Sequence, residues 1–331
     1  MNCSEKKIIT YFIVAFLGFC MVACIKPTKQ ENNILLPVKP VYDSVLKVHD
    51  DALNVILVSD WGRNGFYNQR EVAEKMAEVA SSAGTEFFIS CGDNFQVNGV
   101  QSVNDPLWRI NFEDIYVHPS LQKDWYPVLG NHDYHGNTQA LIDYSHVSRR
   151  WKMPARFYTK TKKLTITTPI LFIFLDTPPL INSYYEEPEE YPDVETQDSL
   201  KQMKWLKTVL NSSTEQWKIA IGHHPVYSAS TKHGNTHELI AKFSPLFEKY
   251  KVDAYFSGHD HDFQHLKPKG SYTDYFVTGT GSAVRESSTD ENSVFSMSAP
   301  GFTYLSVSGN ELKINFIDKE GNIVYTYTKA K

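Results

Sequence analysis

The stretch YFSGHDHDFQH, residues 255–265, joins a strand-like apolar run to a dense cluster of metal-ligand side chains. The apolar run stops at Gly258, and three histidines and two aspartates follow within seven positions. Such a cluster is either a solvated loop rich in histidine or half of a metal site. The second interpretation requires a matching set of ligands elsewhere in the chain.

Similar apolar runs recur along the chain and alternate with helix-like segments. The runs are NVILVSD (54–60), EFFISCGD (86–93), WYPVLGNHD (125–133), ILFIFLD (170–176) and WKIAIGHHP (217–225). Apolar residues at helical spacing predict helices over 69–84, 198–211 and 235–250. Gly-Asn pairs at 309–310 and 321–322 predict hairpins between C-terminal antiparallel strands. The alternation favours an α/β fold, with residues 49–331 as one domain.

Side chains that bind metals follow these runs, at the places where a strand would leave its sheet. They are Asp60, Asp93, Asn131, His132, His223, His259 and His261. Ligands in open α/β sheets bind beyond the carboxyl ends of the strands, so such a fold would gather these residues at one edge. Two cations about 3.5–4 Å apart can clamp a phosphoryl group and activate a water molecule. Mixed oxygen and imidazole ligands suit Fe, Mn or Zn.

Five short motifs together resemble those of the calcineurin-like metallophosphoesterase superfamily. They are SDWG (59–62), GDNF (92–95), GNHD (130–133), GHHP (222–225) and GHDH (258–261). The resemblance is strongest to the tartrate-resistant, purple acid phosphatase branch and covers about residues 53–282. It implies a two-sheet β-sandwich flanked by helices in α/β/β/α layers.

Carried over position by position, the resemblance implies two metal ions (Fe, Zn or Mn) bridged by Asp93. The other expected ligands are Asp60 and His261 for the first ion, and Asn131, His223 and His259 for the second. His132 would contact the phosphate of the substrate, and His233 would protonate the leaving group, a role that suits a histidine of ordinary pKa. The remaining histidines of these segments, His224, His237 and His265, are expected to be structural.

The implied activity is that of an acid-phosphatase-like phosphomonoesterase that uses direct attack of metal-bound hydroxide on small phosphorylated substrates. A phosphodiesterase or nucleotide pyrophosphatase on the same scaffold is the enzymatic alternative. A lipid-anchored binding protein with a degenerate site is an alternative of another class.

One departure from the family pattern affects the first metal. The purple enzymes place a tyrosine ligand three residues after the bridging aspartate, and here that position is Gln96. The superfamily's other solution, a histidine two residues after the first aspartate, is absent because Gly62 stands there. Gln96 would offer an amide oxygen, or a water would take the place. We therefore expect weaker or divalent metal binding at this site, and no tyrosinate-to-iron colour.

The N-terminal residues have the pattern of an exported bacterial lipoprotein. Lys6 and Lys7 precede an apolar run, and the segment Met21–Cys24 resembles a lipobox. Residues 1–23 are predicted to be a signal peptide, and Cys24 is predicted to carry lipid. Residues 24–48 would form a polar tether, so that the membrane-anchored protein faces the periplasm or the cell surface. An ordinary signal peptide with an incidental cysteine is the alternative.

Charge and composition limit the classes of partner that the protein is expected to bind. The net charge of −5 and the scattered basic residues give no footprint for nucleic acid, and we expect a monomer. The acidic run YYEEPEEYPDVETQD (184–198) is expected to be a solvated surface, with a lid near the site as the bolder interpretation.

Overall fold

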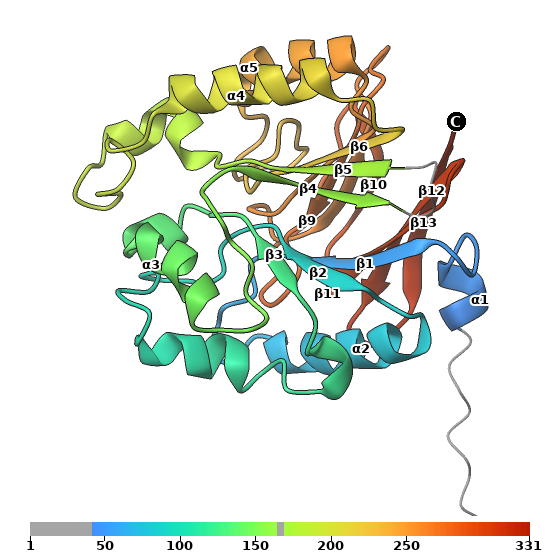
Figure 1. Ribbon diagram of the computed structural model, residues 1–331, viewed down its shortest axis with the longest axis horizontal. Helices are drawn as coiled ribbons and strands as arrows, with labels where there is room; N and C mark the ends of the chain where they lie inside the picture. Colours follow the sequence, from blue (N-terminus) through green and yellow to red (C-terminus); the bar gives the residue numbers. More distant parts are fainter. Residues whose placement is uncertain (1–41, 164–168) are drawn as a thin grey trace, which may run out of the picture. The chain divides into compact units, whose positions relative to one another are not determined.

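Two β-sheets form the centre of the fold in this computed structural model, which describes residues 42–163 and 169–331 (Figure 1). The six-stranded sheet has the order β13 (Ile323–Ala330), β12 (Glu311–Asp318), β11 (Gly301–Val307), β1 (Leu53–Val58), β2 (Phe87–Ser90) and β3 (Trp125–Pro127). The seven-stranded sheet has the order β10 (Ser293–Met297), β8 (Phe263–Leu266), β9 (Asp274–Thr278), β7 (Ala254–Ser257), β6 (Trp217–Ile221), β5 (Pro169–Phe174) and β4 (Tyr158–Lys163).

The two sheets share one hydrophobic core. Strands β1 and β2 are buried at every position, as expected for strands covered on both faces. Aromatic side chains join the sheets: the ring centroids of Phe87 and Phe172 lie 5.5 Å apart, and those of Phe276 and Phe316 lie 6.3 Å apart. The core therefore fixes how the ends of one sheet's strands face those of the other.

Helices cover the outer faces of both sheets (Figure 1). Helix α2 (Gln69–Ser82) buries Val72, Met76 and Val79 in the shared core. Helices α4 (Ser199–Ser212) and α5 (His237–Tyr250) pack their apolar sides on the seven-stranded sheet in a second core. The predicted helices and the layered sandwich are confirmed.

Short elements complete the fold. Helix α1 (Tyr42–Leu46) precedes β1, and helix α3 (Thr138–Asp143) follows the GNHD motif. A π-helical segment spans Trp108–Glu113, and 3-10 turns span Pro119–Leu121, Asp133–His135, Tyr144–His146, Pro178–Leu180 and Asn182–Tyr185.

The segment predicted to be a tether ends earlier than residue 48. Leu46 in α1 is fully buried, and the Tyr42 hydroxyl donates a hydrogen bond of 3.1 Å to the carbonyl of Gly321. The backbone N–H of Val48 donates to Ser306 Oγ at 3.1 Å. Residues 42–48 therefore belong to the folded part, because apolar burial and these bonds fasten them to the six-stranded sheet. The predicted signal peptide and Cys24 lie outside the described residues.

No helix within 42–163 and 169–331 has the length and apolar character needed to cross a membrane.

Candidate functional site

The carboxyl ends of the parallel strands meet between the two sheets. Strands β1, β2 and β3 run parallel in one sheet, and β5, β6, β7 and β9 run parallel in the other. The predicted site residues follow these ends: Asp60 after β1, Asp93 after β2, Asn131 and His132 after β3, His223 after β6, and His259 and His261 after β7. Residues far apart in the sequence are thereby brought together, as the strand-end pattern predicts.

Four of the predicted ligands converge around the amide oxygen of Asn131. This Oδ1 atom lies 3.1 Å from His223 Nε2 and 3.0 Å from His259 Nδ1. His223 Nε2 also lies 3.2 Å from Asp93 Oδ1. Oxygen and imidazole nitrogen atoms at these distances, from nearly buried side chains, form a donor set that fits one of the two predicted ions.

A second donor set forms around Asp60. Its Oδ1 atom is buried, lies 3.3 Å from His261 Nε2, and accepts no hydrogen bond from any residue that the structure describes. Its Oδ2 atom accepts a hydrogen bond of 3.0 Å from the backbone N–H of His259. A fully buried carboxylate oxygen without a donor is costly unless a cation compensates it. One ligand atom each of Asp60, Asp93 and His223 lies within 4.8 Å of the others, so Asp93 stands between the two sets.

The backbone of these loops is held in an unusual conformation. Asp60, Asp93 and His259 all have positive φ, at 58°, 48° and 69°. Non-glycine residues rarely adopt this region, and such strain concentrates at functional sites. At Gly258 a Cβ atom would lie 1.9 Å from Ser59 Oγ, so only glycine allows the two sheets to approach here.

Two supporting residues escaped the sequence interpretation. The Asp133 carboxylate accepts hydrogen bonds from the backbone N–H groups of Asn94 at 3.1 Å and Gly130 at 2.8 Å, tying the GDNF loop to the GNHD loop. The carbonyl of Cys91 lies 2.9 Å from His223 Nδ1, which leaves Nε2 to face the other ligands. The only sequence signal for Asp133 is its place as the last residue of the GNHD motif (130–133).

A cavity of about 170 Å³ opens over the predicted ligands. Its lining residues are Asp93, Asn131, His132, His135, Glu190, Tyr191, Lys232, His233, His259, His261 and Arg285. Both residues with predicted catalytic roles, His132 and His233, are therefore in the site. Arg285 was missed: it follows β9 in a glycine-rich loop, and its Nη1 donates to the carbonyl of His259 at 3.0 Å.

The environment of His233 differs from the ordinary histidine that the sequence suggested. Its ring centroid lies 4.2 Å from that of His259, and its Nε2 lies 3.3 Å from Arg285 Nη1. Partial burial, together with the positive charges of Arg285 and Lys232, lowers the pKa of His233 to about 4. Its imidazole is therefore neutral near pH 7 before substrate arrives.

Gln96 lies beside the bridging position. Its Nε2 atom is 3.4 Å from Asp93 Oδ2, its side chain is nearly buried, and its Oε1 has no hydrogen-bond partner among the described residues. An unpartnered buried amide oxygen on a side chain that contacts Asp93 matches the expected additional oxygen ligand.

Two of the histidines expected to be structural, His224 and His265, make hydrogen bonds with side chains outside the predicted ligand set. Both ring nitrogens of His224 are occupied, by Thr177 Oγ1 at 2.8 Å and the Tyr184 hydroxyl at 2.6 Å. His265 bonds Tyr325 and Asp274 away from the cavity. His237 is the first residue of α5 and does not line the cavity.

Comparisons with known proteins agree with this geometry. The family model described as calcineurin-like phosphoesterase matches residues 53–263. Purple acid phosphatase 7 of Arabidopsis thaliana is 33% identical over 91% of this chain and 93% of its own length. Human tartrate-resistant acid phosphatase type 5 is 34% identical over 83% of this chain and 90% of its own.

One solved structure is similar to this chain in both fold and sequence. GAP50, titled the anchor in the inner membrane complex of Plasmodium, superposes with a TM-score of 0.74 at 26% identity, covering 84% of this chain and 89% of that chain. With its strand-end residues gathered at one cavity and acid phosphatases among its relatives, the chain belongs to the calcineurin-like phosphoesterase family and is a metal-dependent phosphoester hydrolase.

Proposed function

We propose that the chain is a dinuclear metal phosphomonoesterase of the acid phosphatase type. The observation that carries this proposal is the convergence of His223 and His259 on the Asn131 amide oxygen, beside the buried carboxylates of Asp60 and Asp93. The cavity of about 170 Å³ supports a small monoester, because ligand pockets for larger molecules are typically about 300–1,000 Å³.

The ligand assignments belong to this proposal. Asp60 and His261, with the Gln96 amide oxygen, would hold the first ion; Asn131, His223 and His259 would hold the second; Asp93 would bridge them. Fe, Zn and Mn all suit these donors. When bound, two such ions supply charge neutralisation and a water molecule of lowered pKa.

The chain's own side chains bind and orient the substrate. His132, with 28% of its side chain exposed, lies at the cavity where it can donate to a phosphoryl oxygen. Arg285 and Lys232 add positive charge to the lining. His233 would carry the proton to the leaving group, and the negative charge of a phosphate beside it would raise its pKa from about 4. Cys91 is no nucleophile, because burial raises the pKa of its thiol well above the usual range.

Phosphate release from chromogenic esters tests the proposal. With Mn, Zn or Fe added, p-nitrophenyl phosphate should be hydrolysed much faster than bis(p-nitrophenyl) phosphate; the reverse order would favour the phosphodiesterase alternative. Asp93→Ala should abolish turnover, whereas Asp114→Ala, at a surface carboxylate paired with Arg109, should not.

A second candidate is a binding module with a degenerate site. Two observations favour it: Gln96 stands in place of the tyrosine, and the chain is similar to GAP50, the anchor in the inner membrane complex of Plasmodium. It predicts no phosphate release with any of the three metals and no effect of Asp93→Ala.

Localisation is a separate part of the proposal. The lipobox-like segment before Cys24 supports a lipid-anchored, exported protein that meets its phosphorylated substrates outside the cytoplasm.

A further inference from the structure

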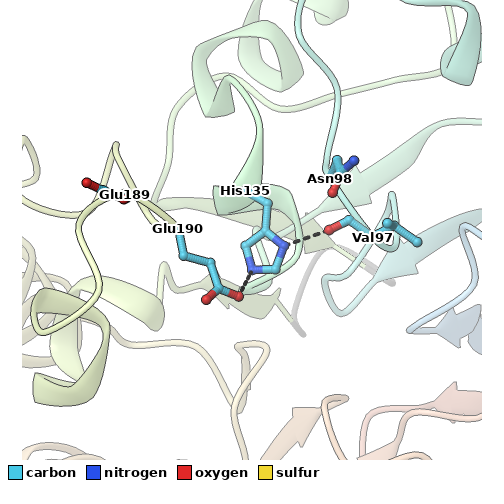
Figure 2. Close-up of a pocket in the computed structure, with 5 residues that line it drawn as sticks. All are labelled: Val97, Asn98, His135, Glu189 and Glu190. Carbon is cyan, nitrogen blue, oxygen red and sulfur yellow. Dashed lines mark hydrogen bonds and ion pairs between the residues drawn. The ribbon is translucent and has the colours of Figure 1, made fainter.

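The cavity over the predicted metal ligands shares a wall with a second cavity. The second cavity has a volume of about 360 Å³ and is lined by Val97, Asn98, His135, Glu189 and Glu190 (Figure 2). His135 and Glu190 line both cavities. These two side chains therefore lie where the metal site adjoins the second cavity.

The shared wall is held by a specific set of contacts. His135 Nε2 lies 3.3 Å from a carboxylate oxygen of Glu190, and His135 Nδ1 lies 2.6 Å from the carbonyl of Val97, so the ring joins the two segments (Figure 2). Val97 has φ of 76°, a strained conformation for a β-branched residue. Val97 directly follows Gln96 in the sequence, and its strained backbone directs its carbonyl toward the His135 ring.

The acidic loop that carries Glu190 is anchored to the site and is not merely a solvated surface. Tyr191 is nearly buried, with its ring 4.6 Å from that of Tyr184 and 4.8 Å from that of His135. Val194 is fully buried, and Asp193 accepts a hydrogen bond of 3.0 Å from the backbone of Thr138 at the start of α3. Residues 185–190 and 195–196 are exposed, as expected for a solvated surface, but Tyr191 and Val194 anchor the run to the site.

Charge is distributed unevenly around the cavity. Arg285 and His233 contact His259, whereas His135 contacts His132, at a ring separation of 5.0 Å. The cationic Arg285 thus lies on the His259 side of the metal site, and Glu190 lies on the His132 side. A phosphoryl group is attracted to metals and cations, and the leaving oxygen must stay within reach of His233. His233 and Glu190 line the same cavity, so the far end of the leaving alcohol is the part that meets Glu190.

We propose that Glu190, positioned by His135, selects phosphomonoesters whose leaving alcohol carries a positive charge, such as an amino alcohol. The same carboxylate opposes a second anionic group in the leaving alcohol, as repulsive contacts do at other selective sites. About half of the Glu190 side chain is exposed, so water and salt screen its charge and keep the preference moderate.

This inference rests on the proposed phosphomonoesterase function, and its test separates the two. The probes are three esters of one size: phosphoethanolamine (cationic), ethylene glycol monophosphate (neutral) and phosphoglycolate (anionic). We expect kcat/KM to fall in that order. Glu190→Gln should lower the cationic-to-anionic ratio by about tenfold, and Glu190→Lys should invert it. High salt should narrow the ratio in the unsubstituted protein.

Glu187→Gln is the matched control, because Glu187 lies in the same acidic run and lines neither cavity. It should leave all three ratios unchanged. Unaltered ratios in both Glu190 variants, with p-nitrophenyl phosphate still hydrolysed, would overturn the selectivity and leave the proposed function standing. Failure to hydrolyse any ester with any metal would overturn both.

Discussion

A Cβ atom on Gly62 would lie 2.0 Å from the carbonyl oxygen of Asn94, so position 62 cannot bear a side chain unless the GDNF loop moves. A histidine at this position is therefore sterically excluded, and we have proposed that Gln96 completes the first donor set instead. Gln96→Tyr should therefore restore a phenolate ligand. We expect the ferric-loaded variant to gain a visible charge-transfer band, measured by absorption spectroscopy with metal content determined in parallel.

Gln96→Phe is the control for this substitution, because it has similar bulk and no oxygen. It should remain colourless. A comparable visible band in the ferric-loaded unsubstituted protein would show that some other tyrosine reaches the ion, and would contradict the assignment of Gln96.

Metal addition should stabilise the fold. Asp60 carries a buried oxygen that accepts no hydrogen bond within the described part of the chain, and a cation bound there compensates it only in the native state. Relative to protein treated with EDTA, saturating Mn or Zn at about 100 times Kd should add about 2.7 kcal/mol per site. Thermal unfolding followed by circular dichroism measures the effect. Asp60→Asn should reduce the metal-dependent rise in Tm, whereas Asp50→Asn, at an exposed turn, should retain it.

Arg285 should contribute to catalysis, although no sequence motif pointed to it. It touches the His259 carbonyl and His233 and lines the cavity, so it can donate to phosphoryl oxygens. Arg285→Ala should lower kcat by about a hundredfold, as loss of one hydrogen-bond donor to the transition state does in other enzymes, with metal content unchanged. Arg109→Ala, at an exposed surface pair, is the control. Equal activity of the two variants in steady-state kinetics would exclude a role for Arg285.

The contrast between Arg285 and the ligands shows what the sequence can and cannot predict. Asp93 and His261 follow apolar runs that identify strands, and parallel strands place such residues together without further information. Arg285 follows β9, and its nearness to the site depends on β9 pairing with β7, a long-range register that local pattern does not encode. Its surrounding loop has no periodicity.

Edge strands and the acidic run escaped prediction for a related reason. Strand β4 reads YTKTKK, whose lysines suit an exposed edge but resemble a loop in composition. In the acidic run, Tyr191 and Val194 are buried beneath exposed glutamates, and only the tertiary contacts with His135 and Thr138 reveal that the segment is anchored.

Cys24 should determine membrane attachment. Cys24→Ser should remove lipid incorporation and release the protein from membranes, because the lipobox-like segment has no other cysteine at its end. Cys20→Ser, within the apolar run, is the control and should remain attached. Detergent partitioning and labelling with a fatty-acid analogue measure the outcome. Labelling that survives Cys24→Ser would show that lipid is attached at another residue, and no labelling of the unsubstituted protein would indicate an ordinary signal peptide.

Asp274 should make the fold sensitive to acid. Its nearly buried carboxylate lies 3.0 Å from the ammonium groups of Lys267 and Lys329 and 3.1 Å from His265 Nε2. Burial alone would raise its pKa, but the His265 hydrogen bond and the two lysines outweigh burial and lower the pKa below the usual range. A depressed folded-state pKa stabilises the native state above about pH 4 and loses this contribution as the pH falls further.

Burial also lowers the pKa of His265, so its protonation opposes folding as the pH falls below about 6.5, the ordinary value. Both groups thus make the free energy of unfolding decrease on acidification. Asp274→Asn leaves two lysines beside a neutral amide and should cost about 3 kcal/mol at neutral pH, measured by urea unfolding across the pH range. The variant should also lose less stability than the unsubstituted protein below pH 4. Parallel pH profiles for the two proteins would show that Asp274 is not the group that titrates.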